Sequence, residues 1–76
     1  MKIKISEFEI KPGFNIRKGS VVALNDMRNG RPIGVEVFDI FKENGEIKIE
    51  SKPRTYGSPM THHAWQYAEF GELIKY

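Results

Sequence analysis

The sequence predicts one mainly β domain, built as a small barrel or an α+β roll, with one short helix near residues 59–70. Seventy-six residues are enough for a single small domain and too few for two. Short runs of β-branched and aromatic residues alternate with turns that contain glycine or proline. Five Phe, three Tyr and one Trp give the chain an aromatic content that disordered chains lack. We therefore expect residues 1–76 to fold as one compact unit.

The first ten residues predict an extended segment whose phase changes halfway. Ile3 and Ile5 fall on one face of an extended chain, whereas Phe8 and Ile10 fall on the other. The change near residues 6–7 indicates either a β-bulge or a corner between two short strands.

A second strand is predicted within residues 17–25, because β-branched residues follow directly after a turn. The step Lys18-Gly19-Ser20-Val21-Val22 resembles the lead-in to the second strand of many SH3-like barrels. This resemblance concerns architecture alone and implies a five-stranded SH3-like barrel. Residues 25–32 are rich in turn formers and predict an exposed loop.

A hairpin is predicted at Asn44-Gly45, which is a strong turn signal. A two-residue loop would place Glu43 opposite Glu46, whereas a three-residue loop would place Phe41 opposite Ile47. Like charges directly opposite each other are unfavourable, so we expect the three-residue loop. That register gathers the apolar residues of the strand over residues 33–42 and of its partner on one face: Val35, Val37, Phe41, Ile47 and Ile49.

A short helix is favoured near residues 59–70, because Ser58-Pro59 is a typical helix start and Gly71 a typical end. The alternative is a strand that presents His63, Trp65 and Tyr67. Residues 73–76 predict a closing strand.

The histidines are the first candidates for metal binding or acid–base catalysis. His62 and His63 are adjacent, so they point to different sides of either a helix or a strand and do not readily share one metal ion. The chain has no cysteine, no glycine-rich phosphate loop and no serine in a nucleophile motif. We therefore expect no enzyme activity, no metal site and no cofactor.

Asp39 is the one carboxylate that the preferred register places on an apolar face, opposite Ile49. A carboxylate in that position needs a hydrogen-bonded partner. The candidates are Arg54, Tyr56 and His63.

The strongest functional signal is the clustering of basic residues in predicted turns. The formal net charge is only +2, yet residues 11–31 carry five basic residues against one acid, and residues 32–51 carry five acids against two lysines. Guanidinium groups bind phosphate in a bidentate manner, and aromatic rings stack on bases. If the turns converge at one end of the fold, they form an anion-binding mouth. The candidate ligand-binding residues are Phe14, Arg17, Lys18, Arg28, Arg31, Lys52, Arg54 and Tyr56.

Our leading hypothesis is a small non-catalytic binding module for an anionic ligand, which would be single-stranded nucleic acid, RNA or a nucleotide. The alternative is a protein-binding accessory or inhibitor protein, of the kind encoded by phages and mobile elements, which acts through an exposed aromatic surface or a sheet edge. Trp65 and Tyr67 would anchor that interface. The competing interpretation of the sole Trp is a core residue.

The sequence also bears on location and assembly. No apolar run approaches the roughly 20 residues of a membrane span, and the first ten residues do not resemble a signal segment. The absence of cysteine fits a cytoplasmic protein. A domain of this size buries only about 60% of its unfolded surface, so a homodimer is a reasonable hypothesis.

Overall fold

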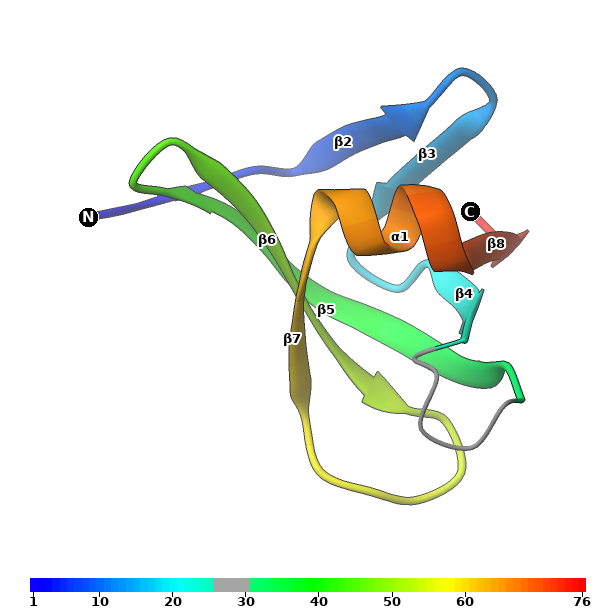
Figure 1. Cartoon of the computed structure of the whole chain (residues 1–76). Helices are drawn as coiled ribbons and strands as arrows, with labels where there is room; N and C mark the ends of the chain where they lie inside the picture. The colour runs from blue at the N-terminus through cyan, green and yellow to red at the C-terminus, as the bar shows by residue number, and fades with distance from the viewer. Residues whose placement is uncertain (26–30) are drawn as a thin grey trace.

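Strands dominate the computed structural model, which describes residues 1–25 and 31–76 (Figure 1). The described residues form eight strands and one short helix, and the prediction of a mainly β domain is confirmed. In chain order the elements are β1 (Lys2–Lys4), β2 (Glu7–Lys11), β3 (Phe14–Arg17), β4 (Val21–Leu24), β5 (Ile33–Glu43), β6 (Glu46–Pro53), β7 (Met60–His63), α1 (Ala64–Phe70) and β8 (Gly71–Lys75).

The main sheet is antiparallel and open. Its strand order is β7-β6-β5-β4-β8, and β1 pairs with β5 outside this path. Strands β2 and β3 form a separate hairpin that rises above the sheet in Figure 1. Within the part of the chain that the structure describes, no closed barrel forms, so the five-stranded SH3-like barrel that the sequence implied is not found.

Strand β5 organises the sheet because one of its edges serves two partners in succession. Its first part pairs with β4, and its last part pairs with β1. Between these ladders, Val37 exchanges backbone hydrogen bonds with Gly19 and Ser20, and the Ile5 amide donates to the Ile40 carbonyl. The edge is therefore bonded on both sides of a short break at residues 38–39.

A β-bulge at Phe38 changes the phase of β5. Val37 pairs with Ser51 and Asp39 with Glu50, so Phe38 is the extra residue. Val37 and Ile40 are both fully buried in the core. Phe38 and Asp39 consequently lie on the opposite side of the strand, which we call the outer face of β5.

The hairpin register that the sequence favoured is wrong. Glu43 pairs with Glu46 across a two-residue loop, and both Asn44 and Gly45 have positive φ, at 53° and 81°. This is the loop whose twist suits a hairpin best. The two like charges are offset by neighbours: the Lys48 ammonium lies 3.3 Å from Glu43, and His63 Nδ1 lies 4.0 Å from Glu46.

The same correction applies to the faces of the hairpin. Phe41 pairs with Lys48, not with Ile47, and Ile40 takes its place in the core opposite Ile49. The bulge accounts for this change, because the predicted face assumed unbroken alternation along the strand. Phe41 is still buried, under the side chains of Lys2 and Lys4 on the outer face.

The helix begins later than predicted. Residues 60–63 form β7, and α1 covers only Ala64–Phe70, with Gly71 at its end as expected. Its first turn is fixed by the side chain of Gln66, which accepts a 2.8 Å hydrogen bond from the His63 amide. The prediction of a helix is thus correct for residues 64–70, whereas the strand alternative holds only as far as His63, because Trp65 and Tyr67 are helical.

The core lies between the inner face of the main sheet, the β2–β3 hairpin and α1. Tyr67 is its only fully buried helical residue among those described, and α1 contacts β2, β6, β7 and β8. The predicted corner near residues 6–7 is confirmed, since β1 and β2 are separate strands, and so is the closing strand, which is β8. Strand β3 was not predicted.

Candidate functional site

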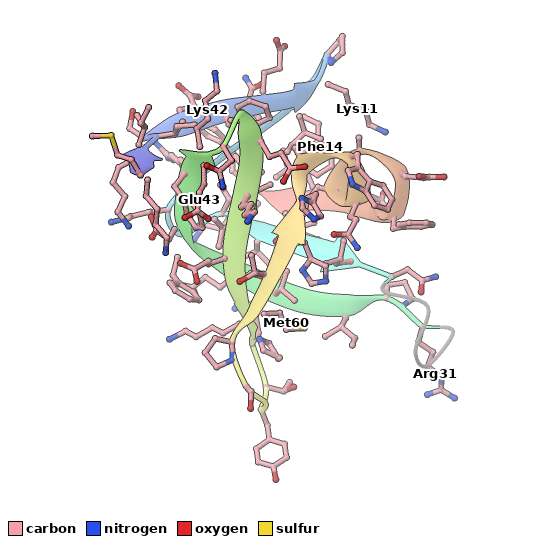
Figure 2. The ribbon with its side chains drawn as sticks, turned by 60° about the vertical axis from the view of Figure 1, so that its left-hand side comes forward. Lys11, Phe14, Arg31, Lys42, Glu43 and Met60 are labelled. Carbon is pink, nitrogen blue, oxygen red and sulfur yellow. The ribbon has the colours of Figure 1, made fainter. Side chains whose placement is uncertain are left out.

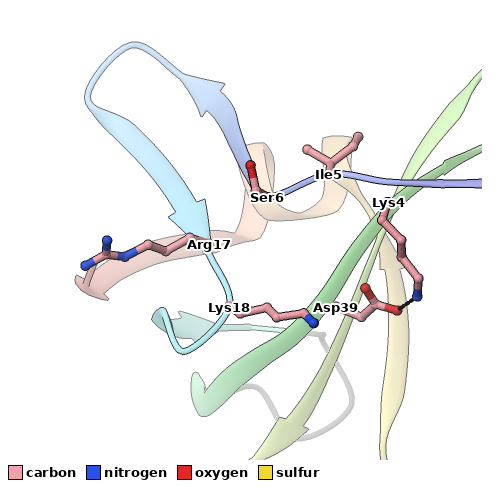
Figure 3. A pocket seen from close by; sticks show the side chains of 6 residues that line it. All are labelled: Lys4, Ile5, Ser6, Arg17, Lys18 and Asp39. Carbon is pink, nitrogen blue, oxygen red and sulfur yellow. Dashed lines mark hydrogen bonds and ion pairs between the residues drawn. The ribbon is translucent and has the colours of Figure 1, made fainter.

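A cleft of about 560 Å³ opens where the edge of β5 changes partner, which is within the size range of ligand sites. We call it the β5 cleft. It lies at the break between the β4 and β1 ladders (Figure 3). Its lining residues are Lys4, Ile5, Ser6, Arg17, Lys18 and Asp39.

Two lysines and one carboxylate face each other in this cleft. Lys4 donates a short hydrogen bond to Asp39, and Lys18 extends toward the same carboxylate from the other side (Figure 3). The hydrogen bond from Lys4 holds the pKa of Asp39 below its ordinary value, and the charge of Lys18 adds to this effect. The cleft is thus basic, with Asp39 as an internal counter-ion.

Asp39 is therefore not placed as the sequence predicted. It lies opposite Glu50, not opposite Ile49, and its partner is Lys4. The Phe38 bulge shifts it to the outer face, where a residue from β1 can reach it.

Arg17 lines the cleft, but its guanidinium group points away from Lys18 and Asp39 (Figure 3). Its Nε donates a 3.3 Å hydrogen bond to the backbone oxygen of Tyr76, and the guanidinium carbon lies 4.2 Å from the Tyr76 ring centroid. The Tyr76 hydroxyl in turn donates a short hydrogen bond to the Glu7 carboxylate. Arg17 thus fastens β3 to the end of the chain.

The basic turns do not converge at one end. Arg17 and Lys18 precede Gly19 and Ser20, which bond to Val37 in the middle of β5, whereas the Arg54 amide donates to the Gly34 carbonyl near the start of β5. Val37 is three positions after Gly34, which corresponds to about 10 Å of extended chain. Arg31 is exposed at the Gly34 end, far from Lys11 and Lys42 in Figure 2. Arg28 lies outside the described residues.

Lys52 lies on the outer face between Lys18 and Arg54. It is exposed and pairs with Glu36, whose neighbours Val35 and Val37 point into the core. The Arg54 side chain covers Gly34 on the same face. Tyr56, in the loop that follows, is 92% exposed. Four predicted residues, Lys18, Lys52, Arg54 and Tyr56, are thus exposed beside or beyond the outer face of β5 and β6.

Phe38 was not among the predicted site residues. Its ring is 36% exposed on the outer face, next to Asp39 and between the cleft and Lys52. The Phe14 ring, by contrast, is 4% exposed and belongs to the core, so the prediction that it stacks on a ligand is wrong. Lys4 was also missed. We call the group Lys4, Lys18, Phe38, Lys52 and Arg54 the β5 strip.

The two predicted interface aromatics differ in exposure. Trp65 is 57% exposed on α1, whereas Tyr67 is fully buried beneath the helix. The prediction of a joint surface is therefore wrong for Tyr67. Residues two apart on a helix point about 200° apart, so an exposed Trp65 requires the other side chain to turn inward.

Three buried side chains that carry polar atoms lie near one another at α1: His62, Ser51 and Tyr67. His62 is 7% exposed and meets the Tyr67 ring edge-on, with 6.1 Å between ring centroids, and Ser51 is fully buried nearby. Burial raises the pKa of Tyr67 to about 12, and the neighbouring Ser51 hydroxyl opposes the shift. Among residues 1–25 and 31–76, no group of three His, Asp or Glu side chains is arranged to hold a metal ion.

Comparisons with known proteins add no relative. In the described part of the chain, no helix is long and apolar enough to cross a membrane. No protein-family model matches the chain, and no curated protein or solved structure shows significant similarity to it.

Proposed function

We propose that this protein is a non-catalytic module that binds single-stranded nucleic acid along the β5 strip. The observation that carries the proposal is the row of groups on one face: two lysines at a cleft, an exposed aromatic ring, and then Lys52 and Arg54. Proteins that bind single-stranded nucleic acid combine basic side chains, which contact the phosphate backbone, with aromatic rings on which bases stack.

Each group of the β5 strip suits one component of single-stranded nucleic acid, either a phosphate or a base. Lysine ammonium groups at the β5 cleft receive one phosphate, and Lys52 and Arg54 receive phosphates further along. Phe38, between them, offers its ring to a base, and stacking of this kind contributes about 1–3 kcal/mol per base. From Asp39 to Gly34 the strip follows about 17 Å of extended chain, which suits a short single-stranded segment.

Three carboxylates reduce the positive charge on and around the β5 strip. Asp39 is neutralised by Lys4, while Glu36 and Glu50 occupy neighbouring positions on the two central strands. We therefore expect modest affinity that depends strongly on salt, because the backbone contacts release counterions. Glu36 provides a test in the favourable direction: Glu36→Gln should tighten binding.

Fluorescence anisotropy with a labelled oligothymidylate of about 12 nucleotides tests the proposal. Binding at about 50 mM salt should weaken at about 200 mM, and Lys18→Ala with Lys52→Ala should reduce the salt slope by about 1.4. Lys42→Ala, an exposed lysine at the hairpin end, is the matched control and should leave affinity unchanged.

Two outcomes would count against the proposal. Absence of oligothymidylate binding at low salt rules out a surface that binds single-stranded nucleic acid. Equal competition by a mononucleotide and by the oligonucleotide would mean that the ligand is a small phosphorylated molecule held in the β5 cleft alone.

A further inference from the structure

Three neighbouring rings lie on the side of the molecule that carries α1, of which Trp65 is exposed while His63 and Phe70 are partly buried. Trp65 is stacked against His63, with ring centroids 6.3 Å apart and planes 11° apart, and Phe70 meets Trp65 edge-on at 6.5 Å. Trp65 remains 57% exposed. We call His63, Trp65 and Phe70 the α1 aromatic surface.

This surface is held in place by its own backbone. His63 ends β7 and precedes α1, and its amide donates to the Gln66 side chain. The strand fixes His63 and the helix fixes Trp65, so their stacking depends on a rigid junction. A ring held in this way loses little conformational freedom on binding, which favours its use as an anchor.

Two carboxylates bracket the ring pair. Glu46, whose side chain is 61% exposed, lies 4.0 Å from His63, and Glu69 is exposed one helical turn after Trp65, on the same side of α1. The nearby lysines are engaged elsewhere: Lys48 pairs with Glu43, and Lys11 donates to the Ala68 carbonyl. The result is a row of acid, ring, ring and acid.

We infer that the α1 aromatic surface binds an arginine-containing basic segment of a partner protein. A guanidinium group is attracted to the face of a Trp ring and pairs well with carboxylates, so it suits both parts of this row. Trp and Arg also dominate the centres of protein interfaces. The surface is acidic where the β5 strip is basic, and this inference does not depend on nucleic-acid binding.

Trp65 is the only Trp in the chain, so its fluorescence reports on this surface directly. A peptide of alternating Arg and Gly should change the Trp65 emission and bind more tightly than an alternating Lys-Gly peptide. A Glu-Gly peptide should not bind. Glu46→Gln with Glu69→Gln should weaken binding several-fold.

Anisotropy of the labelled Arg-Gly peptide extends the test to variants without the Trp. Trp65→Ala should weaken binding at least about tenfold. Glu9→Gln is the matched control: Glu9 is exposed on β2 between two residues that pack on the core, and its change should have no effect. Circular dichroism establishes that each variant is folded, and Glu69→Arg, which keeps the Trp, gives an independent loss.

The inference is overturned if the Arg-Gly peptide fails to bind at low salt. It is equally overturned if the peptide binds Trp65→Ala and Glu69→Arg as tightly as it binds the unaltered protein, because its site would then lie elsewhere.

Discussion

Lys4 and Asp39 form an ion pair that spans the break in the edge of β5. They are 35 residues apart in the chain and are not register partners, since Lys4 lies opposite Phe41. Lys4 is largely exposed, whereas the Asp39 side chain retains only 13% of its exposure. The pair therefore places a fixed negative charge inside a basic cleft.

The first prediction concerns this pair. Lys4→Ala should raise the pKa of Asp39 toward its ordinary value, because it removes the hydrogen bond that lowers that pKa most. A lowered pKa in the folded state contributes stability above the unfolded-state pKa, and this contribution is lost as the pH falls through the folded-state pKa. Carboxyl carbon NMR of Asp39 measures the shift, and an unchanged pKa in the variant would show that Lys4 is not the cause.

The second prediction concerns alkaline pH. Burial raises the pKa of Tyr67 to about 12 from an ordinary value of 10.0. For an acid whose folded-state pKa is raised, stability is full below the unfolded-state value and falls as the pH rises above it. Tyr67→Phe should remove this part of the alkaline loss and change stability at neutral pH by less than about 1 kcal/mol. Thermal unfolding between about pH 8 and 12 compares the two proteins; identical alkaline slopes would contradict the assignment.

The third prediction concerns the backbone of Gly45 in the loop between β5 and β6. Gly45 has a φ of 81° in the two-residue loop, so Gly45→Ala should destabilise the protein by about 1–2 kcal/mol. Gly34→Ala is the matched control, because an added Cβ there meets only the Arg54 side chain at an ordinary 3.8 Å. Urea-induced unfolding measures both. Equal effects of the two substitutions would argue against a left-handed Gly45.

The fourth prediction separates stacking from stability at Phe38. Because the ring is 36% exposed and lies outside the core cluster, Phe38→Ala should destabilise the protein by less than the roughly 3–5 kcal/mol that a core Phe→Ala substitution costs. Affinity for the oligothymidylate should fall by about 1–3 kcal/mol. Phe38→Tyr, which keeps the ring, should retain affinity. A Phe38→Ala variant that binds normally would remove the ring from the proposed site.

The sequence predicted the strand-rich fold because its signals are local. Glycine- and proline-containing turns, β-branched runs and the corner near residues 6–7 all depend on near neighbours. The prediction of which residues share the apolar face of the hairpin was wrong for a different reason. The Phe38 bulge depends on how β5 meets two partners on one edge and a third on the other, and this non-local arrangement leaves no signature in the alternation of residues.

The candidate site was harder to predict than the fold. Phe14 lies between Pro12-Gly13 and a basic run, which favoured a loop, yet it packs in the core from an unpredicted strand. Lys4 belongs to the first strand and comes close to Lys18 only through β5. Exposure of Trp65 depends on where α1 begins, and that position is set by the Gln66 side chain at His63.

The most direct test of the central claim is an amide NMR titration with the oligothymidylate. The proposal predicts that shift changes concentrate at Lys4, Lys18, Phe38, Lys52 and Arg54, while Trp65 and the hairpin at Asn44-Gly45 stay unchanged. Shift changes confined to Trp65 and its neighbours, or an absence of shift changes at low salt, would contradict it.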